Sequence, residues 1–368
     1  MSRSKAVVPD VFGELLGGIC SHTPLAKERP LRWTVIANPT AGGFTIRSRW
    51  KRHAAFLEQC AALAAANPPH AGSAPSDAAG SRGLIPTAGA GHAGAVTRAL
   101  IEEARSAPPA GLYLIITAGG DGTSLEVLTA LYHAPQEIRE NFVVLRLPMG
   151  TGNDGADGPE LDRALKLLID PAVITRQRAL RLTTANPEKT GFLAFNILSV
   201  GLDAFVTHMT NKMKGRLPGD SYKLWVDIAS LLYDRLYKVG PMEVRALDPE
   251  GRVVEAFREK VLLLAVGESG RRTYGSHKRI LPDSRNVCMV RQMPLLRKVA
   301  LKGLFTTGEH VSKPESLLFN ASRVELKGEN PILAQMDGET VLLRPEDFPA
   351  VIELTEPVIP ILRTKLTP

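Results

Sequence analysis

The fold is decided by a stretch that reads YLIITAGGDGTS, residues 113–124. Its apolar part, Leu114 to Ile116, predicts a buried strand, and a helical pattern begins at Ser124. Three glycines stand between the two, where the backbone must turn sharply and can leave its N–H groups free for an anion. Asp121 is the only acid among these glycines. Such a turn can bind a phosphate on its amides and hold a metal or a water on its carboxylate.

The same order of strand, glycine-rich turn and helix recurs through the first half of the chain. Apolar runs predict strands at 33–37, 84–87 and 142–147, and periodic patterns predict helices at 50–66, 93–106 and 161–169. This alternation predicts a parallel, Rossmann-like sheet with helices on both faces. Ligands of such sheets bind outside the carboxyl ends of the strands, where the glycine-rich turns lie.

From about Arg178 the pattern changes to short β-like runs with few helices between them. The runs lie at 181–184, 191–199, 242–247, 257–266, 287–290, 323–326 and 332–336. The main exception is 222–237, which reads as an amphipathic helix. This half therefore predicts an antiparallel sheet domain, a sandwich or a flattened barrel.

The fold class expected is thus α/β plus β, in two domains. Residues 1–30 carry no clear pattern and read as an N-terminal extension or a small docking helix. An α/β domain is expected at 31–170 and a β-rich domain at 171–350. The last apolar run contains Pro357 and Pro360 and fits an edge strand that joins 351–368 to the first domain.

Composition narrows the class of protein. The chain has 368 residues, 44% of them hydrophobic and 23% charged, which suits a globular protein of two domains. Its net charge of +7 suits polyanionic ligands or an anionic membrane surface but is too small to indicate nucleic acid. Three distant cysteines indicate a reduced, cytoplasmic protein. No apolar run approaches the about 20 residues of a membrane span, so any membrane contact is expected to be peripheral.

Each chemistry-bearing segment also fits a purely structural role. Asp121 and Asp203 both fit helix caps. Residues 38–43 and 148–154 read as ordinary turns, and Asp337-Gly338 reads as the tip of a hairpin. The order of the segments along the chain therefore indicates a function more strongly than any one segment does.

Taken together, the segments resemble the diacylglycerol kinase catalytic family, which includes bacterial lipid kinases, sphingosine kinases and ceramide kinases. The ordered matches are Asn38 to Gly42, Gly119 to Thr123 with Glu126, Pro148 to Asp154, Gly201 to Ala204, and Asp337 to Glu339. Thr87 with the Gly91-His92-Ala93 step resembles a further family segment, and the resemblance spans roughly residues 32 to 339.

The resemblance implies an ATP- and Mg²⁺-dependent kinase of a lipid hydroxyl, such as that of diacylglycerol or a sphingoid base, with its site in the cleft between the domains. The implied nucleotide contacts are Asn38, Pro39, Thr40, Ala41, Gly42, Thr87, Gly119, Gly120, Gly122, Thr123, Glu126, Gly150, Thr151 and Gly152. Asp121, Asp154 and Asp203 match acids of a water- and Mg²⁺-linked network. Asp337 and Glu339 match the segment that supplies the general base, and either of the two fits that role.

The chain departs from the family pattern in three places. Leu125 stands before Glu126, and Gly155 replaces the usual aromatic residue after the third match. The segment 274–286 is followed by no Asp-Asp-Gly, so the structural Mg²⁺ site of many bacterial members is not expected, and the acceptor stays open.

Basic residues in the second half fit either a solvated surface or a face that meets anionic lipid headgroups. They are Arg271, Arg272, His277, Lys278 and Arg279, then Arg297, Lys298 and Lys302, and finally Lys212, Lys214 and Arg216.

Two other functions fit the same motifs. One is a kinase of a soluble hydroxyl compound, related to NAD kinases, and the other is a nucleotide-binding regulator without turnover. Retention of five acids, Asp121, Asp154, Asp203, Asp337 and Glu339, argues against the regulator. Nothing in the composition or the resemblance argues against a homodimer.

Overall fold

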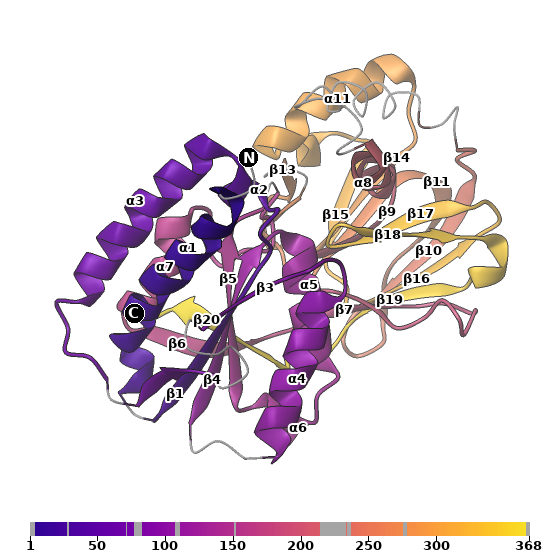
Figure 1. Ribbon diagram of the computed structural model, residues 1–368. Coiled ribbons are helices and arrows are strands. Elements are labelled where there is room, and N and C mark those ends of the chain that lie inside the picture. The colour runs from indigo at the N-terminus through magenta and orange to yellow at the C-terminus, as the bar shows by residue number, and fades with distance from the viewer. Residues whose placement is uncertain are drawn as a thin grey trace. The chain divides into compact units, whose positions relative to one another are not determined.

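The structure, a computed structural model, describes residues 4–27, 29–70, 72–76, 83–106, 111–150, 152–213, 233, 237–274 and 278–365. It divides into two compact units, which we call unit 1 (Met1–Gln177 with Pro357–Pro368) and unit 2 (Arg178–Glu356). Their elements are labelled in Figure 1.

Unit 1 is built on one mixed sheet with the strand order β2-β1-β4-β5-β20-β6, and β3 pairs with β1. The strands are β1 (Leu31–Ala37), β2 (Ser73–Pro75), β3 (Leu84–Pro86), β4 (Leu112–Gly119), β5 (Phe142–Pro148), β6 (Ala172–Gln177) and β20 (Ile359–Thr364). β1, β4 and β5 are parallel, and only β6 runs antiparallel to its neighbour β20. The predicted parallel sheet is thus confirmed, with one antiparallel edge strand.

Helices cover both faces of this sheet (Figure 1). One layer holds α1 (Ser4–Ser21), α3 (Arg47–Ala64) and α7 (Leu161–Ile169), and the other holds α4 (His92–Ser106), α5 (Asp121–Tyr132) and the short α6 (Gln136–Arg139). A single turn, α2 (Gly42–Thr45), follows β1. β4 lies between the layers and is buried along its whole length, as expected for a strand with helices on both sides.

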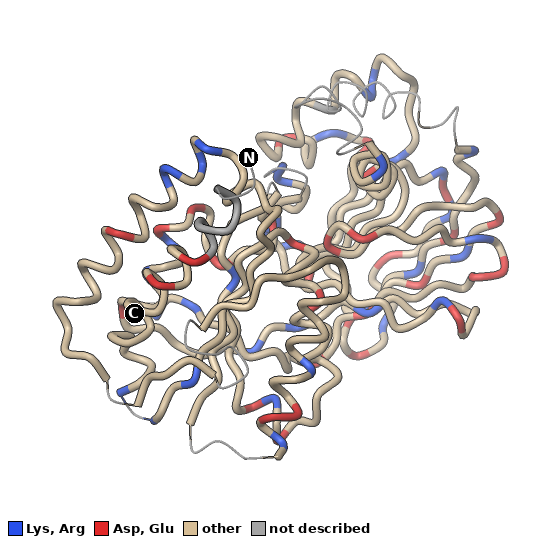
Figure 2. Tube along the Cα trace, viewed as in Figure 1, with Lys and Arg blue, Asp and Glu red and all other residues tan. Residues whose placement is uncertain are grey.

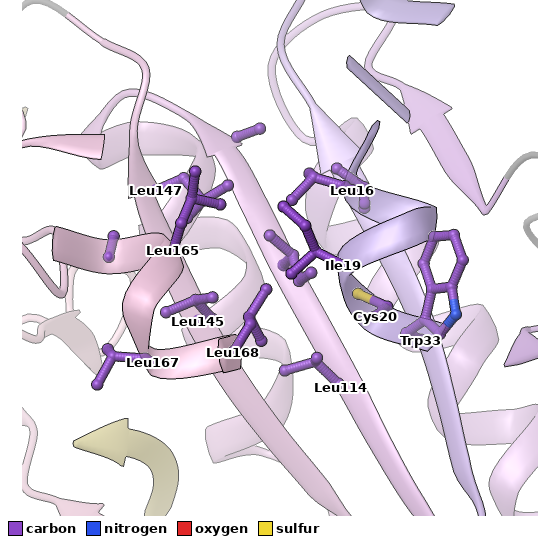
Figure 3. Packing of buried hydrophobic residues seen from close by; sticks show 14 of the residues in the cluster. Leu16, Ile19, Cys20, Trp33, Leu114, Leu145, Leu147, Leu165, Leu167 and Leu168 are labelled. Atoms are coloured by element: carbon purple, nitrogen blue, oxygen red, sulfur yellow. The ribbon is translucent and has the colours of Figure 1, made fainter. Parts of the chain in front are cut away.

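The segment before β1 belongs to the core of unit 1. Phe12, Leu16 and Ile19 of α1 are fully buried, and they pack in one cluster with Leu165 and Leu168 of α7. Figure 3 shows this cluster, with α1 and α7 meeting over the sheet. Helix α1 thus shields one face of the sheet from water, a role that its sequence pattern did not reveal.

Unit 2 is an antiparallel β-rich unit, as predicted. Its main sheet has the order β18-β17-β9-β11-β10-β16-β19-β7-β8, with β14 between β11 and β15, and every pair is antiparallel. The strands are β7 (Leu180–Thr183), β8 (Phe192–Ala194), β9 (Ile197–Gly201), β10 (Pro241–Leu247), β11 (Val253–Gly267), β14 (Val287–Arg291), β15 (Ser316–Phe319), β16 (Arg323–Gly328), β17 (Ile332–Met336), β18 (Glu339–Leu343) and β19 (Ala350–Leu354).

Smaller elements complete unit 2. β12 (Arg272–Tyr274) and β13 (Lys278–Leu281) form a separate ribbon, and α8 (Leu202–Met213) and α11 (Leu295–Thr307) are its helices of more than two turns among the described residues. The helix predicted at 222–237 lies outside the described residues, apart from Tyr233 and Tyr237. None of the helices that the structure describes is long and apolar enough to span a membrane.

The C-terminal apolar run differs from the single edge strand that the sequence predicted. Pro357 separates two strands: β19 pairs with β7 and β16 in unit 2, and β20 lies between β5 and β6 in unit 1. β20 is therefore an interior strand. β20 pairs with the edge of β5 that β4 leaves unpaired. A local apolar pattern cannot show which distant strand has such an unpaired edge.

Candidate functional site

The described residues predicted to contact the nucleotide lie in unit 1 and, apart from Glu126 within α5, at the turns that follow its parallel strands. Asn38 to Gly42 follow β1, Thr87 follows β3, Gly119 to Thr123 join β4 to α5, and Gly150 and Gly152 follow β5. Thr151 lies outside the described residues. The parallel pairing of β1, β4 and β5 brings the three larger turns to one edge of the sheet.

The turn after β1 is organised by the Asn38 side chain. Its Oδ1 accepts the backbone N–H of Thr40 at 3.0 Å and the Thr40 hydroxyl at 2.8 Å, as asparagine does in many turns. Two residues beyond Ala41, the Gly43 N–H donates to the carbonyl of Met149 at 2.8 Å. A Cβ at Gly43 would lie 2.8 Å from that oxygen, so glycine is needed for the contact. The turns after β1 and β5 are thus joined directly.

The turns after β4 and β5 approach each other even more closely. Within the turn after β4, a Cβ at Gly119 would lie 2.4 Å from the side-chain oxygen Oγ1 of Thr123. Between the two turns, a Cβ at Gly150 would lie 2.5 Å from the Cα of Gly120. Only glycine lets these backbones approach so closely. The first turn of α5, a helix of 12 residues, opens at this point and directs backbone N–H groups outward.

Asp121 links these two turns. Its Oδ1 accepts the N–H of Gly155 at 3.0 Å. A Cβ on Gly152 would lie 3.0 Å from Asp121 Oδ2 and 3.4 Å from Asp154 Oδ2, so both carboxylates gather round this glycine. The N-cap of α5 is Gly120 rather than Asp121, so the carboxylate reaches across to the next turn instead of capping its own helix.

An ion-pair network around the buried Asp157 stabilises the segment that follows β5. Asp157 accepts the Arg146 backbone N–H at 2.7 Å and two guanidinium bonds from Arg146 at 2.6 and 3.1 Å. Arg363 of β20 donates to the same carboxylate at 2.5 Å. The Asp157 side chain is 0% exposed. In the same segment Asn153, at φ +58°, accepts a hydrogen bond from the N–H of Gly150 and donates one to its carbonyl.

Glu126 and Thr87, both predicted to contact the nucleotide, have structural partners. The two oxygens of Glu126 accept the N–H groups of Gly91 at 2.7 Å and Gly94 at 3.2 Å, at the start of α4. These bonds satisfy N–H groups that a helix leaves without a partner. The Thr87 N–H donates to the carbonyl of Ala37 at 2.7 Å, which joins the segment after β3 to the end of β1.

Unit 2 carries the other three predicted site acids. Asp203 lies in the first turn of α8, just after Gly201, which has φ +93° and would clash with the Leu262 carbonyl if it had a Cβ. The carboxylate of Asp203 accepts the Ser199 hydroxyl at 2.7 Å.

The two acids of the Asp337-Gly338-Glu339 segment differ sharply in their surroundings. Met336 pairs with Glu339, and positive φ angles at Asp337 (45°) and Gly338 (103°) make the two-residue hairpin tip that the sequence predicted. Asp337 is buried, and its carboxylate accepts backbone N–H groups of Phe195, Asn196 and Ile197 at 2.5 to 3.1 Å. Glu339 is exposed.

The donor types suit magnesium, which prefers oxygen ligands. Asp121 and Asp154 come together in unit 1, and Asp203 belongs to unit 2. Within the residues that the structure describes, no group of three or more His, Cys, Asp or Glu side chains is arranged as a metal site.

Several residues at the site are not among the predicted contacts. Gly43 lies in the turn expected at 38–43, and as the second glycine of a pair it carries a signal that marks a close backbone approach. Asp157 and Arg363 are 206 positions apart, so no local pattern links them.

Comparisons with known proteins agree with this geometry. Residues 32–185 match the family described as diacylglycerol kinase catalytic domain. A probable lipid kinase YegS-like from Enterobacter sp. (strain 638) is 26% identical over 234 residues, covering 62% of this chain and 72% of the relative. The corresponding Cronobacter sakazakii protein is 27% identical over 246 residues, covering 66% and 76%. A putative diacylglycerol kinase from Bacillus anthracis str. Sterne superposes with a TM-score of 0.58 at 18% identity, covering 91% of this chain and 95% of that one.

The protein is therefore a phosphotransferase with an alcohol group as acceptor. Phosphoryl transfer needs donors for phosphate and carboxylates for a cation, and backbone N–H groups in glycine turns and paired acids are groups of these types. The match over residues 32–185 is to the diacylglycerol kinase catalytic-domain family, the family that the ordered motifs resemble, and it contains the first three of those motifs.

The Asp157 network yields a stability prediction. Burial raises the pKa of Asp157, but the charge and hydrogen bonds of Arg146 and the charge of Arg363 outweigh it, so the pKa lies below its usual value. We expect Asp157→Asn to lower the free energy of unfolding at pH 7 by about 3–5 kcal/mol, because the buried Arg146 and the partly buried Arg363 lose their partner. Urea unfolding measures the change.

The pH dependence of stability follows from the lowered pKa of Asp157. The ionised carboxylate contributes its full stabilisation above the unfolded-state pKa of about 3.9, and this stabilisation is lost as the pH falls through the folded-state pKa. The difference between wild type and Asp157→Asn should therefore shrink below about pH 4. Glu102→Gln, which breaks an exposed pair with Arg105, is the control and should cost less than about 1 kcal/mol. Equal stability of wild type and Asp157→Asn at pH 7 would contradict the network's role.

Proposed function

We propose that this protein transfers the γ-phosphate of ATP to the hydroxyl of a lipid such as diacylglycerol or a sphingoid base. The observation that carries the proposal is the meeting of the Gly119–Thr123 turn with the turn after β5, with Asp121 and Asp154 gathered at Gly152. The names of the sequence relatives, probable lipid kinases, support a lipid as the acceptor.

In this proposal the nucleotide lies against the turns of unit 1. Their glycines leave backbone N–H groups open to phosphate oxygens, and the positive end of α5 favours the negative charge. Asp121, Asp154 and Asp203 would hold Mg²⁺, and their all-oxygen donor set suits that ion. When bound, the ion neutralises charge on the phosphates.

We assign proton acceptance from the acceptor hydroxyl to Glu339 rather than to Asp337. Both oxygens of Asp337 already accept backbone N–H groups, so its carboxylate serves to hold the hairpin tip against the start of β9. Glu339 follows two residues later, is exposed and can meet a substrate.

We further propose that the enzyme acts at a membrane surface. Helix α11 exposes Leu296 (84%), Val299 (52%) and Leu295 (44%), and its sequence has three basic and no acidic residues. Single exposed leucines are ordinary, but three within five residues form an apolar face suited to a lipid interface.

The basic residues of unit 2 support this proposal less than the apolar face does. Arg297 pairs with Glu315, and Lys298 is buried. Figure 2 shows charges of both signs interspersed along the strands of unit 2. Lys214, Arg216 and His277 lie outside the described residues, as does the side chain of Lys302.

Transfer of ³²P from ATP to lipids in mixed micelles tests the function. We expect transfer to at least one lipid with Mg²⁺ present, and a loss of more than about a hundredfold in Asp121→Ala while the variant stays folded at the assay temperature. Glu58→Ala on the exposed side of α3 is the control and should keep full activity. Transfer only to NAD or another soluble alcohol, or ATP binding without transfer to any acceptor, would refute the lipid assignment.

The base assignment has its own test. Glu339→Gln should lower kcat by about 10²–10⁴-fold with little change in KM for ATP, because it removes only the proton acceptor. Asp337→Asn should instead lower the unfolding midpoint, because the amide cannot accept all the backbone N–H groups that the carboxylate does. Steady-state kinetics and thermal unfolding measure both. Full kcat in Glu339→Gln would exclude this residue as the base.

The membrane face of α11 is tested by Leu296→Gln. Binding to anionic phosphatidylglycerol vesicles, measured by sedimentation, should weaken about tenfold or more, because a buried leucine contributes about 1.5–3 kcal/mol. The matched control is Leu63→Gln, which alters a leucine that is 52% exposed on α3 of unit 1. If both substitutions weaken vesicle binding equally, or if neither weakens it, α11 is excluded as the docking face.

A further inference from the structure

Two buried polar side chains face each other across strands β9 and β17. The antiparallel register pairs Gln335 directly with Ser199, and both side chains are 0% exposed. Neither residue belongs to the matched family motifs. A polar pair in such a position costs free energy unless all its hydrogen-bonding groups are satisfied, so its partners define its role.

The partners form a chain of hydrogen bonds in which each donor and each acceptor can be assigned. The backbone N–H of Gly338 can only donate, and it donates to Gln335 Oε1 at 3.1 Å. Gln335 Nε2 must then face the other way, and it donates to Ser199 Oγ at 2.9 Å. The single hydroxyl proton of Ser199 is left for Asp203 Oδ2, at 2.7 Å.

This chain connects two segments that the proposed function treats as separate parts of the site. One end is the carboxylate of Asp203 in the first turn of α8. The other end is the backbone at the hairpin tip, next to Glu339. Gln335 Nε2 also lies 3.5 Å from Asp203 Oδ2, so amide and hydroxyl donors both face this carboxylate.

The hairpin tip is therefore held from two sides. Asp337 ties it to the backbone of residues 195–197, and Gln335 fixes the Gly338 amide between Asp337 and Glu339. With both bonds in place the backbone before Glu339 has one orientation. Loss of the Gln335 bond would free the Gly338 peptide while leaving the Asp337 anchor intact.

We propose that Ser199 and Gln335 are positioning residues for the phosphoryl transfer, and that they couple the orientation of Asp203 to that of the Asp337–Glu339 tip. This inference rests on the proposed function for its catalytic meaning, but the coupling itself is a property of unit 2. Both side chains belong to unit 2, and the proposed nucleotide turns belong to unit 1. A change in either should therefore act on turnover rather than on ATP binding.

Hydrogen exchange of the Gly338 amide tests the coupling without any measurement of turnover. Selective labelling with ¹³C-aspartate and ¹⁵N-glycine picks out only the four Asp-Gly steps of the chain, one of which is Asp337-Gly338. We expect Ser199→Ala to speed hydrogen exchange of the Gly338 amide, although Ser199 does not touch it. Gln335→Met, which removes the acceptor itself, should speed it about tenfold.

Kinetics test the positioning role. Ser199→Ala and Gln335→Met should each lower kcat about ten- to a hundredfold with KM for ATP unchanged. The double variant should lose no more than the worse single one, because both break the same chain. Ser322→Ala is the matched control, since its hydroxyl donates to the Leu247 carbonyl elsewhere in unit 2, and it should change neither the Gly338 amide nor kcat.

The outcomes separate this inference from the proposed function. A wild type that phosphorylates no lipid refutes the proposed function, and the Gly338 exchange rates then decide the coupling. An unchanged Gly338 amide in Ser199→Ala, or additive losses of kcat in the double variant, would overturn the coupling whether or not the wild type is a lipid kinase. Thermal unfolding of each variant shows that it is folded under assay conditions.

Discussion

The close approach of two backbone turns is the constraint on which the site in unit 1 depends. The parallel register of β4 and β5 pairs Gly119 with Pro148, so both turns emerge at the same edge of the sheet. A side chain on Gly150 would collide with Gly120. With no side chain there, the first turn of α5 stays open to phosphate, and Asp121 can reach across to Gly155. One packing requirement thus accounts for both the proposed anion site and the paired acids.

Burial and hydrogen bonding divide these acids into buried anchors and carboxylates that the proposed function uses. Asp157 and Asp337 are buried and have strong donors on their carboxylates, so they hold turns in place. Glu339 is exposed and follows an anchored tip. Asp121 combines the two roles, because one oxygen fixes the neighbouring turn while the other lies near Asp154 across Gly152. Charge alone would not distinguish these acids.

Local patterns predicted most of the secondary structure. The helix expected at 161–169 is α7, the strand expected at 142–147 is β5, and Asp337-Gly338 is the tip of the β17–β18 hairpin. These succeed because periodicity and turn chemistry act over a few residues. The core role of α1 and the interior position of β20 were not predicted, because both depend on surfaces made by distant segments.

The sequence by itself determined the fold class, the glycine turns and the resemblance to a kinase family, because ordered motifs and periodic apolar runs are local properties of the chain. Only the tertiary structure decided what each polar group does. Glu126 faces the start of α4, Asp337 accepts three backbone amides, and Ser199 meets Gln335 through strand register. Hydrogen bonds act over about 3 Å, and only folding brings residues so far apart in the chain within that distance.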